Sequence, residues 1–126
     1  MADFKLTPLR KALAALAEAL NTPKSDIVRD AAIQRFEYCF ELTWKALKRY
    51  FKLNNKKDIH NIKDIFREAG NQGLIRSVED WFGYLDSRNL TSHTYDLNTA
   101  ERVYESAVKF EMEAKSLLEK LLKYEA

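Results

Sequence analysis

The chain has 126 residues, of which 46% are hydrophobic and 32% are charged, and its formal net charge is only +2. This length suffices for one domain with a single hydrophobic core, without metal or disulfide support. The small net charge excludes a strong polyanion-binding field over the whole chain, so a nucleic-acid role would need a local basic surface. The single cysteine, Cys39, excludes an internal disulfide. With no signal peptide or membrane span, we expect one cytoplasmic domain over residues 1–126.

The first predicted helix begins at Thr7-Pro8, where a hydroxyl cap precedes a proline at the first helical position. Its leucines recur at spacings of three and four and form one apolar stripe: Leu6, Leu9, Leu13, Leu16 and Leu20. A break at Asn21-Thr22-Pro23 separates this helix from a long second one, which runs from about Ser25 to Leu53 without glycine or proline.

One face of the long helix is apolar, and charged residues occupy another face. The apolar face comprises Ile33, Phe36, Phe40, Trp44, Leu47 and Phe51. Helical spacing favours the core for these aromatic side chains over a platform on which bases stack. Tyr38 and Leu42 lie away from this stripe, nearly opposite it. They therefore predict a second contact surface on the same helix.

Three further helices follow a polar break at residues 54–58. A short helix is predicted around Asn61 to Asn71, and the region Gly70 to Gly73 closes it. The runs Ser77–Asp80 and Asn98–Glu101 resemble capping boxes, so each predicts the start of another helix. The last helix carries apolar residues at heptad-like spacing: Val103, Ala107, Phe110, Ala114, Leu117, Leu121 and Tyr124. These patterns predict an all-α fold, an antiparallel up-and-down four-helix bundle with one additional short helix.

The segment SRNLTSHTYD, residues 87–96, is unlike the helices around it because hydroxyl, amide and cationic side chains gather there. Arg88 and His93 are five residues apart, so on an unbroken helix their side chains would point roughly 140° apart. They can serve one site only if the helix ends or bends between them, or if two subunits contribute. The hydroxyl groups in the segment favour a helix end, because they compete for backbone hydrogen bonds.

Two interpretations of this cluster are open. In the structural one, Arg88 pairs with a carboxylate, His93 caps the helix and Tyr95 covers the end of the bundle. In the functional one, the cluster cuts RNA or is modified by a partner. Spacing alone favours the structural interpretation, since short motifs have high false-positive rates. His60 has no partner at metal-ligand spacing and Cys39 has no neighbouring base, so we predict neither a metal site nor a thiol nucleophile.

A resemblance shifts the balance toward function. It rests on three segments in chain order: residues 33–50 (IQRFEYCFELTWKALKRY), 67–75 (REAGNQGLI) and 88–95 (RNLTSHTY). Together they resemble the nucleotidyltransferase substrate-binding protein family, a branch of the HEPN superfamily that includes HepT-type toxins. The resemblance covers nearly the whole chain and implies a helical bundle that forms homodimers. It also implies a partner, a minimal nucleotidyltransferase that is encoded separately and often by the adjacent gene.

The resemblance also implies roles for four residues of the last segment. The HEPN pattern is an arginine, four to six residues and a histidine; Arg88 and His93 match it, and Asn89 is the polar residue that often follows the arginine. Two such motifs would meet across a dimer as a metal-independent ribonuclease site. There the histidine would move a proton and the arginine would brace the phosphate. The HepT pattern adds a tyrosine, here Tyr95, to which the nucleotidyltransferase attaches AMP and so blocks the ribonuclease.

Two functions are therefore expected, from different classes. The first is binding: a dimeric partner subunit of a minimal nucleotidyltransferase in a toxin–antitoxin-type pair, with Tyr95 as the AMP acceptor. The second is enzymatic: an endoribonuclease toxin that uses Arg88 and His93 across the dimer, with RNA as a further partner. Neither function calls for a metal or an organic cofactor, and neither involves a membrane.

Overall fold

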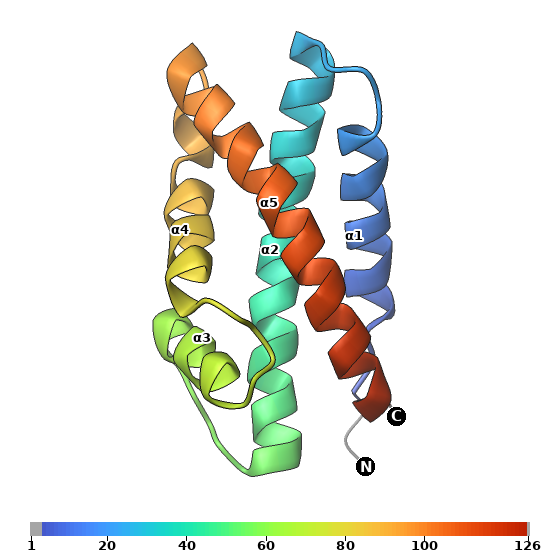
Figure 1. Ribbon diagram of the computed structural model, residues 1–126, viewed down its shortest axis with the longest axis vertical. Helices are drawn as coiled ribbons and strands as arrows, with labels where there is room; N and C mark the ends of the chain where they lie inside the picture. The colour runs from blue at the N-terminus through green and yellow to red at the C-terminus, as the bar shows by residue number, and fades with distance from the viewer. Residues whose placement is uncertain (1–3, 126) are drawn as a thin grey trace.

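The computed structural model describes residues 4–125, and these residues form five α-helices and two short 3-10 helices, with no strand among them (Figure 1). The α-helices are α1 (Thr7–Leu20), α2 (Asp26–Asn55), α3 (Ile62–Asn71), α4 (Val78–Asn89) and α5 (Leu97–Leu121). The 3-10 helices are η1 (Thr91–His93), between α4 and α5, and η2 (Leu122–Tyr124), after α5. The all-α bundle predicted from the sequence is confirmed.

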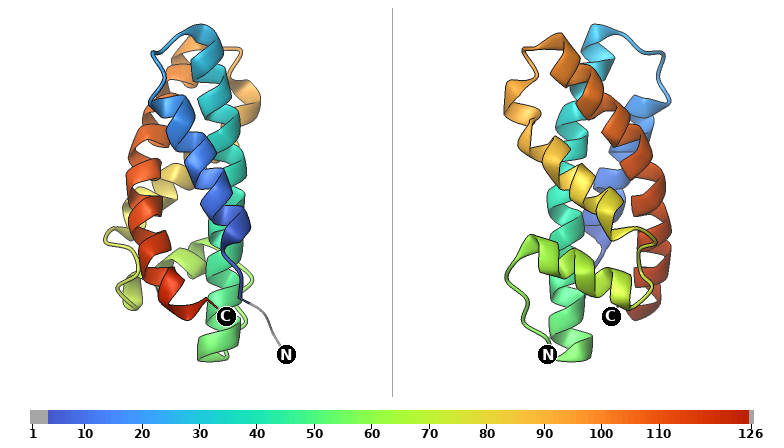
Figure 2. Two further views of the ribbon diagram at one scale, coloured as in Figure 1. Left: turned by 90° about the vertical axis from the view of Figure 1, so that its right-hand side faces the viewer. Right: turned by 60° about the vertical axis from the view of Figure 1, so that its left-hand side comes forward.

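The longest helix, α2, lies at the centre of the arrangement (Figures 1 and 2). In Figure 1, α1 runs upward on one side of α2, and α3 and α4 follow one another on the other side. α4 runs upward and α5 returns downward across α2, so α1, α2, α4 and α5 alternate in direction and α3 is the additional short helix. None of the helices in the described chain combines the length and the apolar character that a membrane crossing requires.

Aromatic side chains fill the centre of the bundle and join four helices. The ring of Phe110 on α5 packs edge-on against Phe36 of α2, with 5.3 Å between ring centroids, and against Trp81 of α4 at 5.6 Å. Phe66 of α3 lies 5.8 Å from Phe40 of α2. These five side chains are fully buried, and such edge-to-face contacts add to the stabilisation that burial of the rings provides. The predicted apolar face of α2 is thus the core face, with Trp44 only half-buried at its edge.

Two predicted helix caps were wrong, although α1 does begin at Thr7. The N-cap of α1 is Leu6 rather than Thr7, and its backbone N–H donates to Glu125 Oε2 at 2.9 Å, a carboxylate from the other end of the chain. The N-cap of α5 is Asp96, whose Oδ2 accepts from the backbone N–H of Thr99 at 3.1 Å, so Asn98 lies inside the helix. In both cases a carboxylate satisfies a free N–H near the helix start, where negative charge is favoured.

The other helix starts agree with the sequence. Ser25, Asn61 and Ser77 are the N-caps of α2, α3 and α4, and each side chain accepts a hydrogen bond from a backbone N–H of the first turn. The cap at Ser77 fixes the start of α4, the helix that carries Arg88 near its C-terminal end.

Candidate functional site

The predicted site lies where α4 ends and the chain turns toward α5. α4 ends at Asn89, and η1 covers residues 91–93 before α5 begins. The break between Arg88 and His93 that their spacing required is therefore present. Thr91 supports it, because its Oγ1 lies 2.8 Å from the Arg88 carbonyl and 2.9 Å from Glu37 Oε2, so its single proton can donate to either acceptor.

Arg88 is held against α2. Its Nη1 lies 2.9 Å from Glu41 Oε1, and its guanidinium carbon lies 5.7 Å from the ring centre of Phe40. The other oxygen of Glu41 accepts from Trp44 Nε1 at 3.1 Å. The side chains of Arg88 and Glu41 are only 25% and 29% exposed, so this is a partly desolvated ion pair. The prediction that Arg88 pairs with a carboxylate is thus correct for this single chain.

The ion pair leaves hydrogen-bonding capacity unused. Arg88 Nε and Glu41 Oε1 are buried, and neither has a hydrogen-bond partner within residues 4–125, so the two groups meet as charges without an aligned hydrogen bond. Buried donors without partners are rare and costly in folded proteins. Arg88 Nε is therefore a buried donor that no acceptor among the described residues satisfies.

His93 and Tyr95 project from the connection into solvent. Their ring centroids are 6.1 Å apart in an edge-to-face arrangement, His93 is exposed, and the Tyr95 side chain is 86% exposed. The structural interpretation required Tyr95 to cover the end of the bundle, and this prediction is wrong because the side chain is exposed. The neighbouring caps are Leu90 for α4 and Asp96 for α5, so His93 caps neither helix.

The predicted residues are close along the chain, but they do not form one compact site. Within the described residues no hydrogen bond, ion pair or ring contact joins Arg88 to His93. Asn89 is exposed at the last position of α4. One chain therefore presents a half-buried arginine on α4 and an exposed histidine and tyrosine beyond it.

Two carboxylates on α2 were missed by the sequence analysis. Glu37 and Glu41 are one helical turn apart, and they contact Thr91 and Arg88 respectively. The helical pattern placed both on the charged face of α2, because it cannot show that η1 and α4 contact them. Glu37 is exposed, whereas Glu41 is half-buried. A signal was nevertheless present: the pair lies in the segment 33–50 that the family resemblance joins to the segment 88–95.

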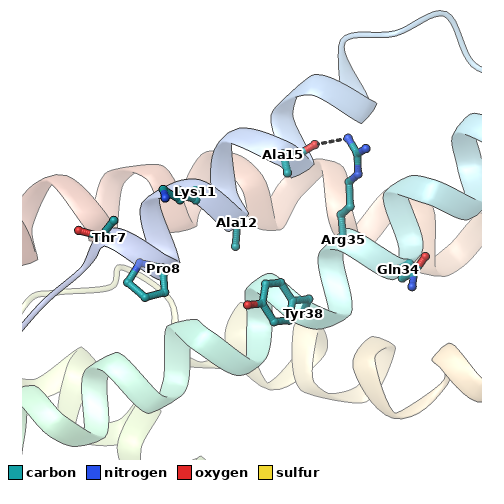
Figure 3. Close-up of a pocket in the computed structure, with 8 residues that line it drawn as sticks. All are labelled: Thr7, Pro8, Lys11, Ala12, Ala15, Gln34, Arg35 and Tyr38. Carbon is teal, nitrogen blue, oxygen red and sulfur yellow. Dashed lines mark hydrogen bonds between the residues drawn. The ribbon is translucent and has the colours of Figure 1, made fainter.

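A separate groove of about 660 Å³ lies between α1 and α2 (Figure 3). It is lined by Thr7, Pro8, Lys11, Ala12, Ala15, Gln34, Arg35 and Tyr38. Arg35 joins the two helices, since its Nη1 donates to the Ala15 carbonyl at 2.7 Å. The Tyr38 side chain is 60% exposed beside this groove. Leu42 is half-buried and packs against the core, so of the two residues predicted to form a second contact surface only Tyr38 is prominently exposed.

Cys39 is buried in the core, and its burial raises the pKa of the thiol to about 12. The thiol is therefore protonated, and unreactive as a nucleophile, at any ordinary pH. Within the described part of the chain, no group of three or more histidine, cysteine, aspartate or glutamate side chains is arranged to hold a metal ion.

Known proteins are similar to this chain in sequence and in the arrangement of their helices. Residues 4–123 match the family described as nucleotidyltransferase substrate binding protein like. A Haemophilus influenzae relative named "Probable ribonuclease HepT" is 43% identical over 100 residues, which cover 76% of this chain and 68% of the relative.

Two solved structures have the same fold. One, from Thermus thermophilus, is similar with a TM-score of 0.84 and 36% identity, over 90% of this chain and 98% of that one. The other, from Haemophilus influenzae, is described as revealing the fold of a substrate binding domain of a nucleotidyltransferase. It is similar with a TM-score of 0.83 and 34% identity, over 93% of this chain and 98% of that one. The chain therefore belongs to the nucleotidyltransferase substrate-binding protein family.

Proposed function

We propose that this protein is the dimeric partner subunit of a minimal nucleotidyltransferase in a toxin–antitoxin-type pair, and that Tyr95 is its acceptor for AMP. Membership of the family implies a nucleotidyltransferase partner. The observation that carries the acceptor role is the 86% exposure of Tyr95 on a connection between two helices. It is the most exposed tyrosine of the described chain, whereas Tyr84 is buried and burial raises the pKa of its phenol to about 12.

The transfer would join Tyr95 Oη to the α-phosphorus of ATP and release pyrophosphate. The phenol must give up its proton as the bond forms, and His93 is the adjacent side chain that can accept it. The partner enzyme would bind the nucleotide and stabilise the charge on its phosphates. The acceptor needs only to reach that active site, which its place on an exposed connection allows.

The second candidate function is metal-independent cleavage of RNA by two Arg88–His93 motifs that face one another across a dimer. The partial exposure of the Arg88 side chain and the exposure of His93 favour it, because solvent reaches part of each side chain. His93 would take the proton of a 2′-hydroxyl, whose oxygen attacks the neighbouring phosphorus. The 5′-oxygen would then leave with a proton, and the product would end in a 2′,3′-cyclic phosphate. Arg88 would stabilise the charge that develops on the phosphate oxygens.

Co-expression with the nucleotidyltransferase encoded by a neighbouring gene tests the first proposal. We expect a stable complex to co-purify, and the intact mass of this chain to rise in AMP-sized steps when ATP is added. Tyr95→Phe removes the acceptor oxygen and should abolish every step. Tyr38→Phe is the matched control, because Tyr38 is also exposed and should leave the modification unchanged.

The experiment tests the partner role and the acceptor role of Tyr95 independently. A complex that forms while the mass of the wild-type chain stays constant, with a partner shown to bind ATP, removes the acceptor role of Tyr95. The absence of any complex removes the partner role as well.

A further inference from the structure

Charge is distributed unevenly along α2. Between Glu41 and Asp58 the chain has six lysines and arginines and no aspartate or glutamate. Its formal net charge of +2 therefore conceals a local excess of positive charge over the C-terminal half of this helix and the two residues that follow it. A local surface of this kind is what binding to a polyanion would need in a chain of low net charge.

Five side chains of this stretch line a groove of about 330 Å³, which we call the α2 basic groove: Trp44, Lys45, Lys48, Arg49 and Lys52. Lys45, Lys48 and Lys52 form no ion pair with another residue of the described chain, so no carboxylate there neutralises their charge. These three lysines therefore carry the positive charge of the groove that no described carboxylate neutralises.

Trp44 differs from the other aromatic residues on its face of α2. Phe36, Phe40 and Phe51 are fully buried, whereas Trp44 is half-buried and lines the groove. The Lys45 ammonium lies 5.8 Å from the centre of its ring. Part of an aromatic face is thus available among cations, which is the combination that holds single-stranded nucleic acids: the ring stacks on a base and the cations contact phosphates.

The α2 basic groove is linked to Arg88 through Glu41. Glu41 accepts from Trp44 Nε1 at 3.1 Å through one oxygen and pairs with Arg88 Nη1 at 2.9 Å through the other. Glu41, Trp44, Lys48 and Lys52 are three or four residues apart, so they follow one face of the helix. Their backbone path, from Glu41 to Lys52, is about 16 Å long. A strand whose phosphate reached Arg88 would meet Trp44 next and then the lysines.

We propose that the α2 basic groove binds single-stranded RNA that leads to the Arg88–His93 motif, with a base stacked on Trp44 and phosphates held by Lys48 and Lys52. That the bound strand leads to a cleavage site rests on the second candidate function, RNA cleavage. Binding of RNA to the groove does not depend on cleavage. An acidic protein surface, such as one on the partner nucleotidyltransferase, could also satisfy the lysines. The exposed part of the Trp44 ring favours a nucleobase over such a surface, because a base uses both the ring and the charges.

The test measures binding of the full-length His93→Ala protein, which cannot cut by the proposed chemistry, to a fluorescent oligouridylate over a range of salt concentrations. Lys48→Gln with Lys52→Gln should lower the slope of log affinity against log salt by about 1.4, since each phosphate contact on a single strand contributes about 0.7. Lys109→Gln with Lys115→Gln is the matched control, because it removes the same charge from exposed positions on α5 and should leave the slope unchanged.

Two substitutions of Trp44 separate stacking from its hydrogen bond to Glu41. Trp44→Leu should weaken binding roughly 5- to 150-fold, which corresponds to the loss of one stacked base. Trp44→Phe also loses the bond to Glu41 but keeps an aromatic face, so it should retain most of the affinity. Circular dichroism shows whether each variant is folded. Because both variants lose the hydrogen bond to Glu41, the difference between their affinities reports only the loss of the aromatic ring.

Each outcome decides the assignment. Unchanged affinity and slope in the lysine variant, or equal weakening by Trp44→Leu and Trp44→Phe, overturns it. If the variants bind RNA normally but lose the co-purifying nucleotidyltransferase, the groove is a protein interface and the RNA assignment is wrong. Wild-type protein that binds RNA through the groove but never cuts it overturns the cleavage function and supports the groove.

Discussion

Arg88 on α4 and Glu41 on α2 form an ion pair with 2.9 Å between Nη1 and Oε1, and this contact joins the arginine of the predicted motif to the central helix. The pair orients the guanidinium, but it also places a negative charge where the proposed cleavage of RNA would require a phosphate to bind. A phosphate that approaches Arg88 must therefore share the guanidinium with Glu41 or displace it. Trp44 holds the second oxygen of Glu41 and limits how far that carboxylate can move.

Glu41→Gln should lower the free energy of unfolding by about 1–3 kcal/mol, because it leaves a partly buried guanidinium without its counter-charge. Urea denaturation measures the loss. Glu119→Gln is the control, since Glu119 is exposed on α5 and makes no ion pair with a described residue, and its effect should stay within about 0.5 kcal/mol. Equal losses in the two variants would mean that the Arg88–Glu41 pair contributes nothing specific to stability.

If His93 is the proton-transfer group of the proposed cleavage, His93→Ala should slow RNA cleavage by roughly 10²–10⁴-fold. It should change stability by no more than about 0.5 kcal/mol, because the side chain is exposed. The assay uses isolated protein with EDTA, total RNA and defined oligonucleotides, and it identifies cyclic phosphate ends. Wild-type protein that cuts nothing, or a variant that cuts equally well, would end the enzymatic interpretation.

Arg88→Ala should slow cleavage by a similar order through lost charge stabilisation, but unlike His93→Ala it should also lower the melting temperature. The reason is that Glu41 would lose its counter-ion and Phe40 its cation contact. Thermal unfolding of the two variants side by side measures this difference. Identical melting temperatures would show that Arg88 adds nothing to the fold.

We expect light scattering to give twice the mass of one chain, because the proposed composite site needs two motifs. Tyr38→Asp should shift the protein toward the monomer if Tyr38 belongs to the dimer contact. Met112→Asp introduces the same charge at a similarly exposed position on α5 and should leave the dimer intact. A monomer at every concentration rules out the composite site, and the reverse result for the two variants assigns the contact to α5.

The free energy of unfolding should decrease at alkaline pH because of the buried thiol of Cys39. Burial raises the folded-state pKa of the thiol to about 12 from its ordinary value of 9.0, so the folded state retains the thiol proton more strongly than the unfolded state. The resulting stabilisation is fully present below pH 9 and is lost as pH rises toward 12, with a slope of up to about 1.4 kcal/mol per pH unit. Urea denaturation between these values, compared with Cys39→Ala, isolates this contribution. If the free energy of unfolding had the same pH dependence in the wild type and in Cys39→Ala, this contribution of Cys39 would be contradicted.

The sequence predicted what depends on neighbours along one helix and missed what depends on contacts between helices. The three-four spacing around Phe110 identified the core face of α5 because that face repeats every turn. The cap of α1 could not be found in this way, since Leu6 is bonded by Glu125 from the far end of the chain. The role of Glu41 was missed for the same reason: the helical pattern placed it on the charged face of α2, and only the packing of α4 against α2 makes it the partner of Arg88.

The bond between Leu6 and Glu125 has a practical consequence for how the molecule can be handled. It brings both ends of the described chain to one pole of the bundle, while the connection that carries Tyr95 lies at the opposite pole (Figure 1). A reporter fused to either terminus would therefore be held away from the surface on which a partner is expected to act. Immobilisation through either end should present Tyr95 outward, so surface-binding experiments can use whichever fusion is better expressed.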